Sequence, residues 1–289
     1  MTHAIMVGVD GSAESVSAAD WAAQEAVRRR LPLQLVHAWL WQPVDVPVVQ
    51  DGETQAQAAK GMLQQVEQDL TDRYPTAQVS ADVVGDTAVS ALLDAAERAD
   101  MLVVGSRGHG ALLGFLLGSC GLQVISAAHC PVIAVRARAE DDLPVRDEVV
   151  VGQQGGVKDS KATLQFAFEA AAARGSAVRA VRAWSLPPVL AYSPASMHLV
   201  DSAGGLEPYE RAALDEALAP WRERYPDVPV VGHVEMGSAG QVLLSATPGA
   251  ALLVVGRRRR HSPVGSRIGS VAHAALHHAR CPVAVIPHS

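Results

Sequence analysis

The sequence predicts an α/β protein made of two tandem domains, each a doubly wound sheet of five parallel strands with helices on both faces. Three observations support this fold class. The chain repeats itself at a spacing of about 150 residues, far longer than the unit of a solenoid. Within each copy, short apolar runs alternate with longer helical segments, which is the pattern of β–α–β units. The short runs are continuously apolar, as in strands that are buried on both faces of a sheet.

Three stretches of the chain recur at one spacing. Residues 100–105 (DMLVVG) return as residues 251–256 (ALLVVG), a shift of 251 − 100 = 151. Residues 129–135 (HCPVIAV) return as residues 280–286 (RCPVAVI), and the YP pair at 74–75 returns at 225–226, both at the same shift. We therefore predict one domain at residues 1–138 and a second at residues 146–289, joined by a short charged linker that contains a proline.

The elements of the first copy follow from local patterns, taken in chain order. A strand at residues 4–9 runs into a turn signal (GVDGS), after which Ser12 or Ser15 caps an Ala-rich helix that reaches about Arg30. The remaining strands are predicted at residues 33–39, 78–84, 101–104 and 132–135, and the remaining helices at 53–73, 87–98 and 119–128. Sheets of this kind hold ligands at the carboxyl ends of their strands, at a topological switch point.

Composition and charge exclude several classes of function. Apolar residues make up 49% of the 289 residues, which is enough for buried cores and too much for a disordered chain. With 24 basic and 30 acidic residues, the formal charge of −6 disfavours nucleic acid as a partner. No apolar run reaches the ~18 residues of a membrane helix, and the N-terminus lacks the pattern of a signal peptide. Because three cysteines fit a reducing compartment, we expect a soluble, cytoplasmic protein without a membrane partner.

The strongest functional motif is a glycine-rich loop that follows the fourth predicted strand. It contains Gly105, Gly108 and Gly118, and the pair Gly118-Ser119 opens the next helix. Glycine lets backbone N–H groups approach phosphate oxygens, and the positive end of the helix attracts the same anion. The loop is neither a P-loop nor a dinucleotide-binding glycine motif. Ordinary turn glycines are the alternative, which we do not favour at this spacing.

The spacing Gly105-x2-Gly108-x9-Gly118-Ser119 resembles the ATP-binding motif of the universal stress protein family. The strand end at residues 7–12 (VGVDGS) and residues 129–132 (HCPV) are also similar to that family, and the resemblance covers nearly the whole chain as two tandem domains. It implies an adenine nucleotide in the first domain. The nucleotide-binding residues that it implies are Gly8, Val9, Asp10, Ala38, Val84, Gly105, Arg107, Gly108, Gly118, Ser119 and Cys120.

Within this set, the resemblance implies that Ala38 and Val84 lie near the adenine and Asp10 near the ribose and phosphates. The first copy departs from the family pattern after Ser119, where the family has Val and then Ser or Thr, because this chain has Cys120 and a glycine there. One phosphate-binding hydroxyl is therefore missing, and AMP or ADP are alternatives to ATP. Asp10 has three interpretations: a turn residue at the helix start, a ribose contact, and a ligand of an Mg²⁺ ion bound with ATP.

The second copy departs further from the motif. Gln154 stands where the first copy has Asp10, and Arg259 stands where it has Gly108. A long Arg side chain at that point would occupy the path of the phosphates. We expect the second site to be weak, altered or empty.

Three other groups of reactive residues have simpler interpretations that we favour. We interpret Arg257–Arg260 as a solvated loop rather than an anion-binding patch, because the whole protein is acidic. His273 and His277 lie four residues apart on a predicted helix, and without an evident third ligand we interpret them as an ordinary helix face rather than a metal site. Cys120 lies in the first turn of a helix, where the dipole lowers a thiol pKa, so a redox role is its alternative.

The leading functional hypothesis is a nucleotide-binding regulatory protein that acts in a stress response through its shape or oligomeric state and is not an enzyme. A slow ATPase is the second hypothesis, and it would need a base or a water-orienting carboxylate beside the phosphates. Asp10 is the only acid that the sequence places there. A ligand-free structural module is the third hypothesis, which the altered second copy supports for that half of the chain.

The first testable prediction is that the two domains pair within one chain. The resemblance implies pairing through the last strands, and those strands, at residues 132–135 and 283–286, are short, apolar and uncharged. We expect them to lie antiparallel, and two such chains to associate as a homodimer through another surface. Cysteines introduced at Ala134 and Ala284 should then cross-link within single chains in dilute protein. Efficient linking between chains, without linking inside one chain, would contradict this arrangement.

Overall fold

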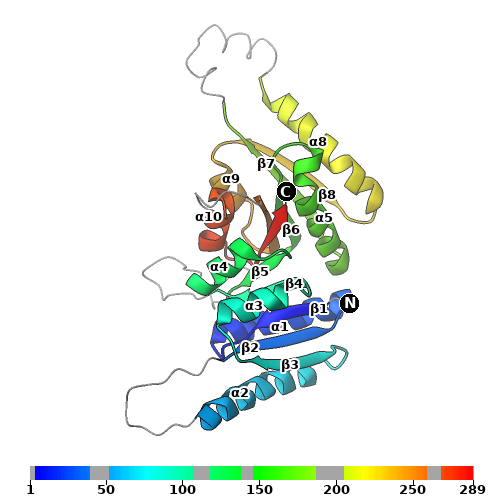
Figure 1. The fold of residues 1–289 in the computed structure, drawn as a ribbon. Coiled ribbons are helices and arrows are strands. Elements are labelled where there is room, and N and C mark those ends of the chain that lie inside the picture. The colour runs from blue at the N-terminus through cyan, green and yellow to red at the C-terminus, as the bar shows by residue number, and fades with distance from the viewer. Residues whose placement is uncertain are drawn as a thin grey trace. The chain divides into compact units, whose positions relative to one another are not determined.

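A computed structural model describes residues 4–39, 52–106, 118–137, 146–186, 205–258 and 268–288. The chain divides into two compact units, Met1–Asp142 and Leu143–Ser289. In the described part of each unit, five parallel strands form a sheet with helices on both faces (Figure 1), which confirms the predicted fold class.

The first unit alternates strands and helices along the chain. Its described elements are β1 (Ala4–Gly8), α1 (Ala13–Arg29), β2 (Leu33–Ala38), α2 (Gly52–Arg73), β3 (Val79–Val84), α3 (Ala88–Ala96), β4 (Ala99–Gly105), α4 (Ser119–Ala127) and β5 (Val132–Val135). The strand order is β3-β2-β1-β4-β5, and each neighbouring pair is parallel. Helices α1 and α2 contact each other on one face of this sheet, and α3 and α4 contact each other on the opposite face.

The second unit repeats this arrangement. Its described elements are β6 (Arg146–Gly152), α5 (Val157–Arg174), β7 (Ala177–Trp184), α8 (Glu207–Arg224), β8 (Val230–Met236), α9 (Ala239–Ser245), β9 (Ala250–Arg258), α10 (Ser270–His278) and β10 (Val283–His288). The strands run in the order β10-β9-β6-β7-β8, again with parallel neighbours. Helices α5 and α8 pack together on one face, and α9 and α10 pack together on the other.

The strand order defines a switch point in each unit. From β1 the chain goes to β2 on one side and later to β4 on the other, and β6 lies between β7 and β9 in the same way. Because the strands are parallel, their carboxyl ends meet at one edge of the sheet, and a crevice opens where the order reverses. All four strands beside the two switch points have a glycine at or near this edge: Gly8, Gly105, Gly152 and Gly256.

Local sequence explains where the long helix of the first unit begins and ends. Ser12 is the N-cap of α1, because its hydroxyl accepts a hydrogen bond from the N–H of Ser15 at 3.2 Å. The helix ends at Arg30, which takes the left-handed conformation (φ 55°) that is uncommon for a side chain other than glycine. The helix buries alanines against the sheet, whose central residues Ile5 and Val7 are fully inaccessible to solvent.

The predicted element ends differ from the structure mainly around β4. This strand begins at Ala99 rather than at residue 101, and α3 ends at Ala96 rather than at residue 98. Ala99 pairs with Ala4 across an irregular step in the register, so pairing extends past the continuously apolar run that marks the strand in the sequence.

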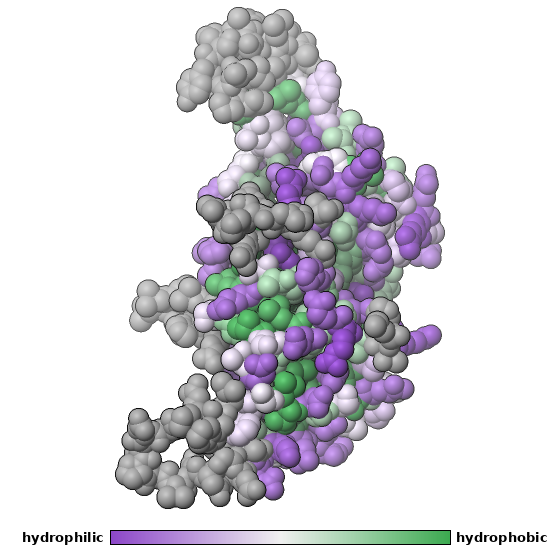
Figure 2. Space-filling model, in the orientation of Figure 1, coloured by the Kyte–Doolittle hydropathy of each residue, from purple (hydrophilic) through white to green (hydrophobic). Residues whose placement is uncertain are grey.

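In the described residues, no helix is both long enough and apolar enough to cross a membrane. The surface over α8 is hydrophilic (Figure 2) and carries two ion pairs, Arg211 with Glu207 and Arg222 with Asp215.

Candidate functional site

The first unit brings most of the sequence-predicted nucleotide residues to one edge of its sheet. Gly8, Ala38, Val84 and Gly105 are the last residues of β1, β2, β3 and β4. Ala38 and Val84 are register partners in neighbouring strands, so the two residues predicted to lie near the adenine are adjacent. Arg107 and Gly108 lie outside the described residues.

Asp10 lies in the turn between β1 and α1, where its carboxylate takes part in the helix start. Its Oδ1 accepts hydrogen bonds from the N–H of Ser12, at 3.0 Å, and from the Ser12 hydroxyl. The turn is completed by Gly11, whose φ of +80° requires glycine at this position. Asp10 is exposed. The structure therefore gives this carboxylate a structural role in the turn, and the Asp10 side chain is accessible to solvent.

Val9 is a buried backbone link between β1 and β2. Its N–H donates to the carbonyl of Val36 at 2.9 Å, and its carbonyl oxygen lies 2.7 Å from Nδ1 of His37. The His37 ring therefore holds the chain directly before Asp10, a contact that the sequence motif does not indicate.

Gly105 is required by a close approach of two backbones. A Cβ at this residue would lie 2.8 Å from the carbonyl carbon of Glu14 and 2.8 Å from the nitrogen of Ser15. Because main-chain atoms cannot rotate away, only glycine fits where the end of β4 meets the first turn of α1. This contact places the start of the glycine loop beside the Asp10 turn.

The first turn of α4 has the properties of an anion site. Its N-cap is Gly118, which offers no side chain to the helix amides and whose own Cβ would meet nothing within 4 Å. The next two residues, Ser119 and Cys120, begin the helix. The N–H groups and the positive dipole end at a helix start favour an anion such as a phosphate.

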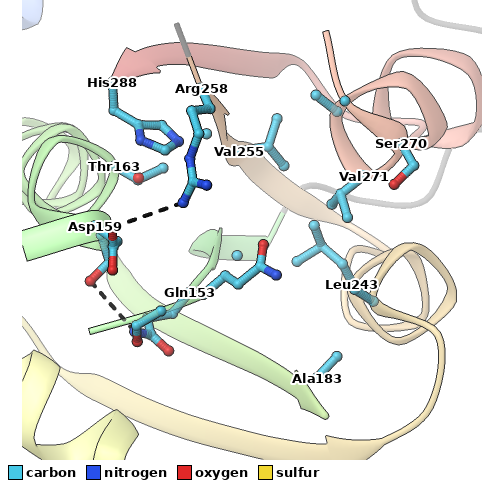
Figure 3. A pocket seen from close by; sticks show the side chains of 18 of the residues that line it. Gln153, Asp159, Thr163, Ala183, Leu243, Val255, Arg258, Ser270, Val271 and His288 are labelled. Atoms are coloured by element: carbon cyan, nitrogen blue, oxygen red, sulfur yellow. Dashed lines mark hydrogen bonds and ion pairs between the residues drawn. The ribbon is translucent and has the colours of Figure 1, made fainter. Parts of the chain in front are cut away.

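The second unit contains a cavity of about 480 Å³ at its switch point. It lies at the carboxyl ends of β6, β7 and β9 and against the first turns of α5, α9 and α10 (Figure 3). Its floor includes Gly152 and Gly256, which correspond to Gly8 and Gly105 of the first unit. The altered second copy therefore keeps a ligand-sized space at this edge.

Charged groups line one side of this cavity. Arg258 lies 3.9 Å from Asp159, whose other oxygen accepts a hydrogen bond from the N–H of Gly156 at 3.2 Å and so caps α5. Figure 3 shows Asp159, Arg258 and His288 on this side, facing Leu243 and the start of α10 across the cavity. The start of α10 is again a glycine, Gly269, with φ of +83° and no capping side chain.

A second polar network holds the base of the cavity. Arg182 on β7 donates to Gln153 Oε1 at 2.7 Å and pairs with Glu210 of α8 at 2.6 Å. Gln153 in turn donates to the carbonyl of Gly155 at 3.0 Å. These bonds fix the segment that contains Gln154, which replaces the first unit's Asp10.

The arginine run behaves differently from the sequence interpretation. Arg257 and Arg258 belong to the end of β9 rather than to a loop, and Arg257 is buried. Both residues lie in a strand rather than a loop, because β9 pairs with β10 as far as Arg258 and His288. The interpretation as solvated is wrong for the buried Arg257, whereas Arg258 is exposed. Arg259 and Arg260 lie outside the described residues.

Among the described residues, no cluster of three or more His, Cys, Asp or Glu side chains is arranged to hold a metal ion. The rings of His273 and His277 lie 4.2 Å apart. Burial, and then the charges of His277 and His278, lower the pKa of His273.

The cysteines differ in their surroundings. Burial raises the pKa of the Cys130 thiol to about 11, which makes it unreactive at neutral pH. Cys281 is buried as well, whereas Cys120 is partly accessible at the start of α4.

Each unit is thus an α/β domain with a doubly wound parallel sheet and glycines at the strand ends beside its switch point. The model of the universal stress protein family matches residues 1–136 and 146–287. The chain therefore belongs to the universal stress protein family, as a member with two tandem domains.

Several known proteins are similar to this chain. A universal stress protein of Mycobacterium tuberculosis (strain H37Rv) is 36% identical over 296 residues, covering 98% of this chain and 96% of the relative. The crystal structure of a universal stress protein from Archaeoglobus fulgidus covers the whole of both chains with a TM-score of 0.69 at 17% identity, which shows the shared fold. Another universal stress protein, solved in complex with cAMP, is 27% identical and covers 47% of this chain and 98% of its own, with a TM-score of 0.37.

Proposed function

We propose that this protein is a regulatory adenine-nucleotide-binding protein that holds ATP in its first domain and acts through its shape or oligomeric state. The observation that carries this proposal is the cavity at the switch point of the second domain. The two domains are repeats with the same strand order, so the same edge of the first domain is the place for a ligand. The first domain adds the complete glycine motif at that edge.

The proposed roles follow from the positions of the residues. The uncapped first turn of α4, with Gly118, Ser119 and Cys120, takes the phosphates together with Arg107 and Gly108 of the loop. Ala38 and Val84 border the base, since they are small or apolar and adjacent at the strand ends. Gly8, Val9 and Gly105 form the floor of the proposed nucleotide site, where the main chain approaches the ligand.

We propose binding rather than turnover. An ATPase needs a base or a carboxylate that orients water beside the phosphates. Asp10 is the acid that the sequence places at this edge, and its Oδ1 already accepts two hydrogen bonds from Ser12. A carboxylate oxygen engaged in this way is a weak base.

Mass spectrometry of the denatured, freshly purified protein tests the proposal directly. We expect an adenine nucleotide to be released, and we favour ATP. AMP and ADP are the alternatives, because Cys120 stands where the family pattern departs and one phosphate-binding hydroxyl is missing. Release of no adenine nucleotide, together with no binding of added ATP, would contradict the proposed function.

The role of Asp10 can be separated by its dependence on magnesium. A carboxylate repels phosphates unless a cation or ribose hydroxyls intervene, and Mg²⁺ binds through one or two carboxylates and phosphate oxygens. We expect Asp10→Ala to weaken ATP binding more with Mg²⁺ than without it, by about tenfold against about threefold in calorimetric titrations. Equal losses would indicate ribose contact alone, and no loss would reduce Asp10 to the turn role seen in its bonds to Ser12.

A further inference from the structure

The cavity of the second domain is lined by the hydroxyl-bearing side chain of Thr163. Thr163 on α5 is 97% buried, since only 3% of its surface is exposed, and it lines the cavity. Within the part of the chain that the structure describes, its Oγ1 makes no hydrogen bond and is accessible from the cavity. A hydroxyl in this position can donate a hydrogen bond to a bound ligand or accept one from it.

The surroundings of Thr163 are open because of Gly256. A Cβ at Gly256 would lie 3.5 Å from the Thr163 hydroxyl and 3.0 Å from the ring of His288. Figure 3 shows Thr163 beside His288, Arg258 and Asp159, so the hydroxyl belongs to the polar side of the cavity.

Two of these polar groups, the Thr163 hydroxyl and the Asp159 carboxylate, have no equivalent in the first domain. The first helices of the two domains begin at Ala13 and Val157, a shift of 157 − 13 = 144, so Thr163 corresponds to Ala19 and Asp159 to Ser15. The repeat shift of 151 makes Arg258 the counterpart of Arg107. The second domain therefore keeps the arginine and adds a carboxylate and a hydroxyl beside it.

The added carboxylate changes the charge that a ligand meets. The guanidinium of Arg258 is 3.9 Å from Asp159, so the pair presents no net charge to an incoming group. A triphosphate gains little from such a pair and is repelled by its carboxylate. A neutral group with hydroxyls suits it better, because hydroxyls can donate to Asp159, accept from Arg258, and do either with Thr163.

The opposite side of the cavity is apolar. Leu243 of α9 and Val271 of α10 lie across from the polar side, and Ala183 lies at the end of β7 (Figure 3). This combination of an apolar wall and a hydroxyl-binding wall fits a flat base joined to a sugar.

We propose that the cavity of the second domain binds an uncharged nucleoside through Thr163, Asp159 and Arg258, and that the Asp159 carboxylate excludes nucleoside triphosphates. The identity of the base as adenine rests on the proposed function of the first domain, because the two domains are repeats. One chain then binds two related ligands, the triphosphate in the first domain and the nucleoside in the second.

The experiment titrates adenosine into the full chain by calorimetry, in a Gly108→Arg background that blocks the first domain. We expect one adenosine site, and Thr163→Val, which keeps the side-chain shape, should weaken it by about three- to tenfold. The same variant should unfold at an unchanged or higher temperature, because the lost hydroxyl has no protein partner. Unchanged adenosine affinity, or clear thermal destabilisation by Thr163→Val, would overturn the proposal.

A second variant tests the exclusion of triphosphate. Asp159→Asn keeps an oxygen to cap Gly156 but removes the negative charge beside Arg258. In the same background it should weaken adenosine, and when combined with Arg259→Gly, which clears the path of the phosphates, it should bind ATP more tightly than Arg259→Gly alone. Asp215→Asn, a charge change on the exposed face of α8, is the matched control and should change neither ligand. Equal ATP affinity of the Arg259→Gly chain with and without Asp159→Asn would overturn the charge argument. A chain that fails to bind ATP in its first domain, yet binds adenosine through Thr163, would contradict the proposed function and support this inference.

Discussion

Calorimetric titration of the native chain with ATP should give about one site per chain, in the first domain. The first domain has the full glycine motif and an uncapped helix start at Gly118. The second domain has Arg259 in place of the middle glycine and Asp159 beside Arg258. Both substitutions oppose a chain of phosphates, one by volume and one by charge.

Gly108→Arg should remove this site. It introduces into the first domain the residue type that the second domain carries at the equivalent position, and we expect at least a hundredfold loss of ATP affinity. The matched control is Gly61→Arg, because Gly61 is exposed on α2 and a Cβ there meets nothing within 4 Å. Two ATP sites in the native chain, or heat of binding that survives Gly108→Arg, would show that the second domain also takes the triphosphate.

The fold could be predicted from the sequence because its signals are local and repeated. Continuous apolar runs mark strands buried on both faces, and because the sequence repeats after 151 residues, two copies of the pattern indicate each element. The misplaced start of β4 shows the limit of such signals. Asp100 interrupts the apolar run, while the pairing of Ala99 with Ala4 is a tertiary contact that no local pattern indicates.

The candidate site was predictable only in part. The glycines were recognisable by spacing, but spacing does not separate a glycine needed by a ligand from one needed by packing. Thr163 could not be recognised, because a threonine in an Ala-rich helix becomes significant only when the packed structure places it at the cavity. The pairing of Asp159 with Arg258 likewise joins residues 99 positions apart, 258 − 159 = 99.

Gly105→Ala should destabilise the first domain by about 2–3 kcal/mol. The new Cβ would lie 2.8 Å from main-chain atoms of Glu14 and Ser15, so the start of α1 or the end of β4 must move. Urea denaturation followed by circular dichroism measures this loss as a lower transition midpoint. Gly61→Ala is the matched control with the opposite sign, because it lies in the open on α2 and should gain about 0.5–1 kcal/mol from helix propensity.

Gly118→Ser separates ligand binding from stability at the other end of the same loop. Position 118 has a φ of −56° and open space around its Cβ, so serine fits and should leave stability unchanged or raise it by a few tenths of a kcal/mol as an N-cap. Its hydroxyl would then accept from the amides at the start of α4 that we assign to the phosphates, and ATP affinity should fall about tenfold. If Gly118→Ser left ATP affinity intact, the amides of α4 would not be phosphate ligands. If Gly105→Ala were as stable as the native chain, the contact between β4 and α1 would be looser than the 2.8 Å approach requires.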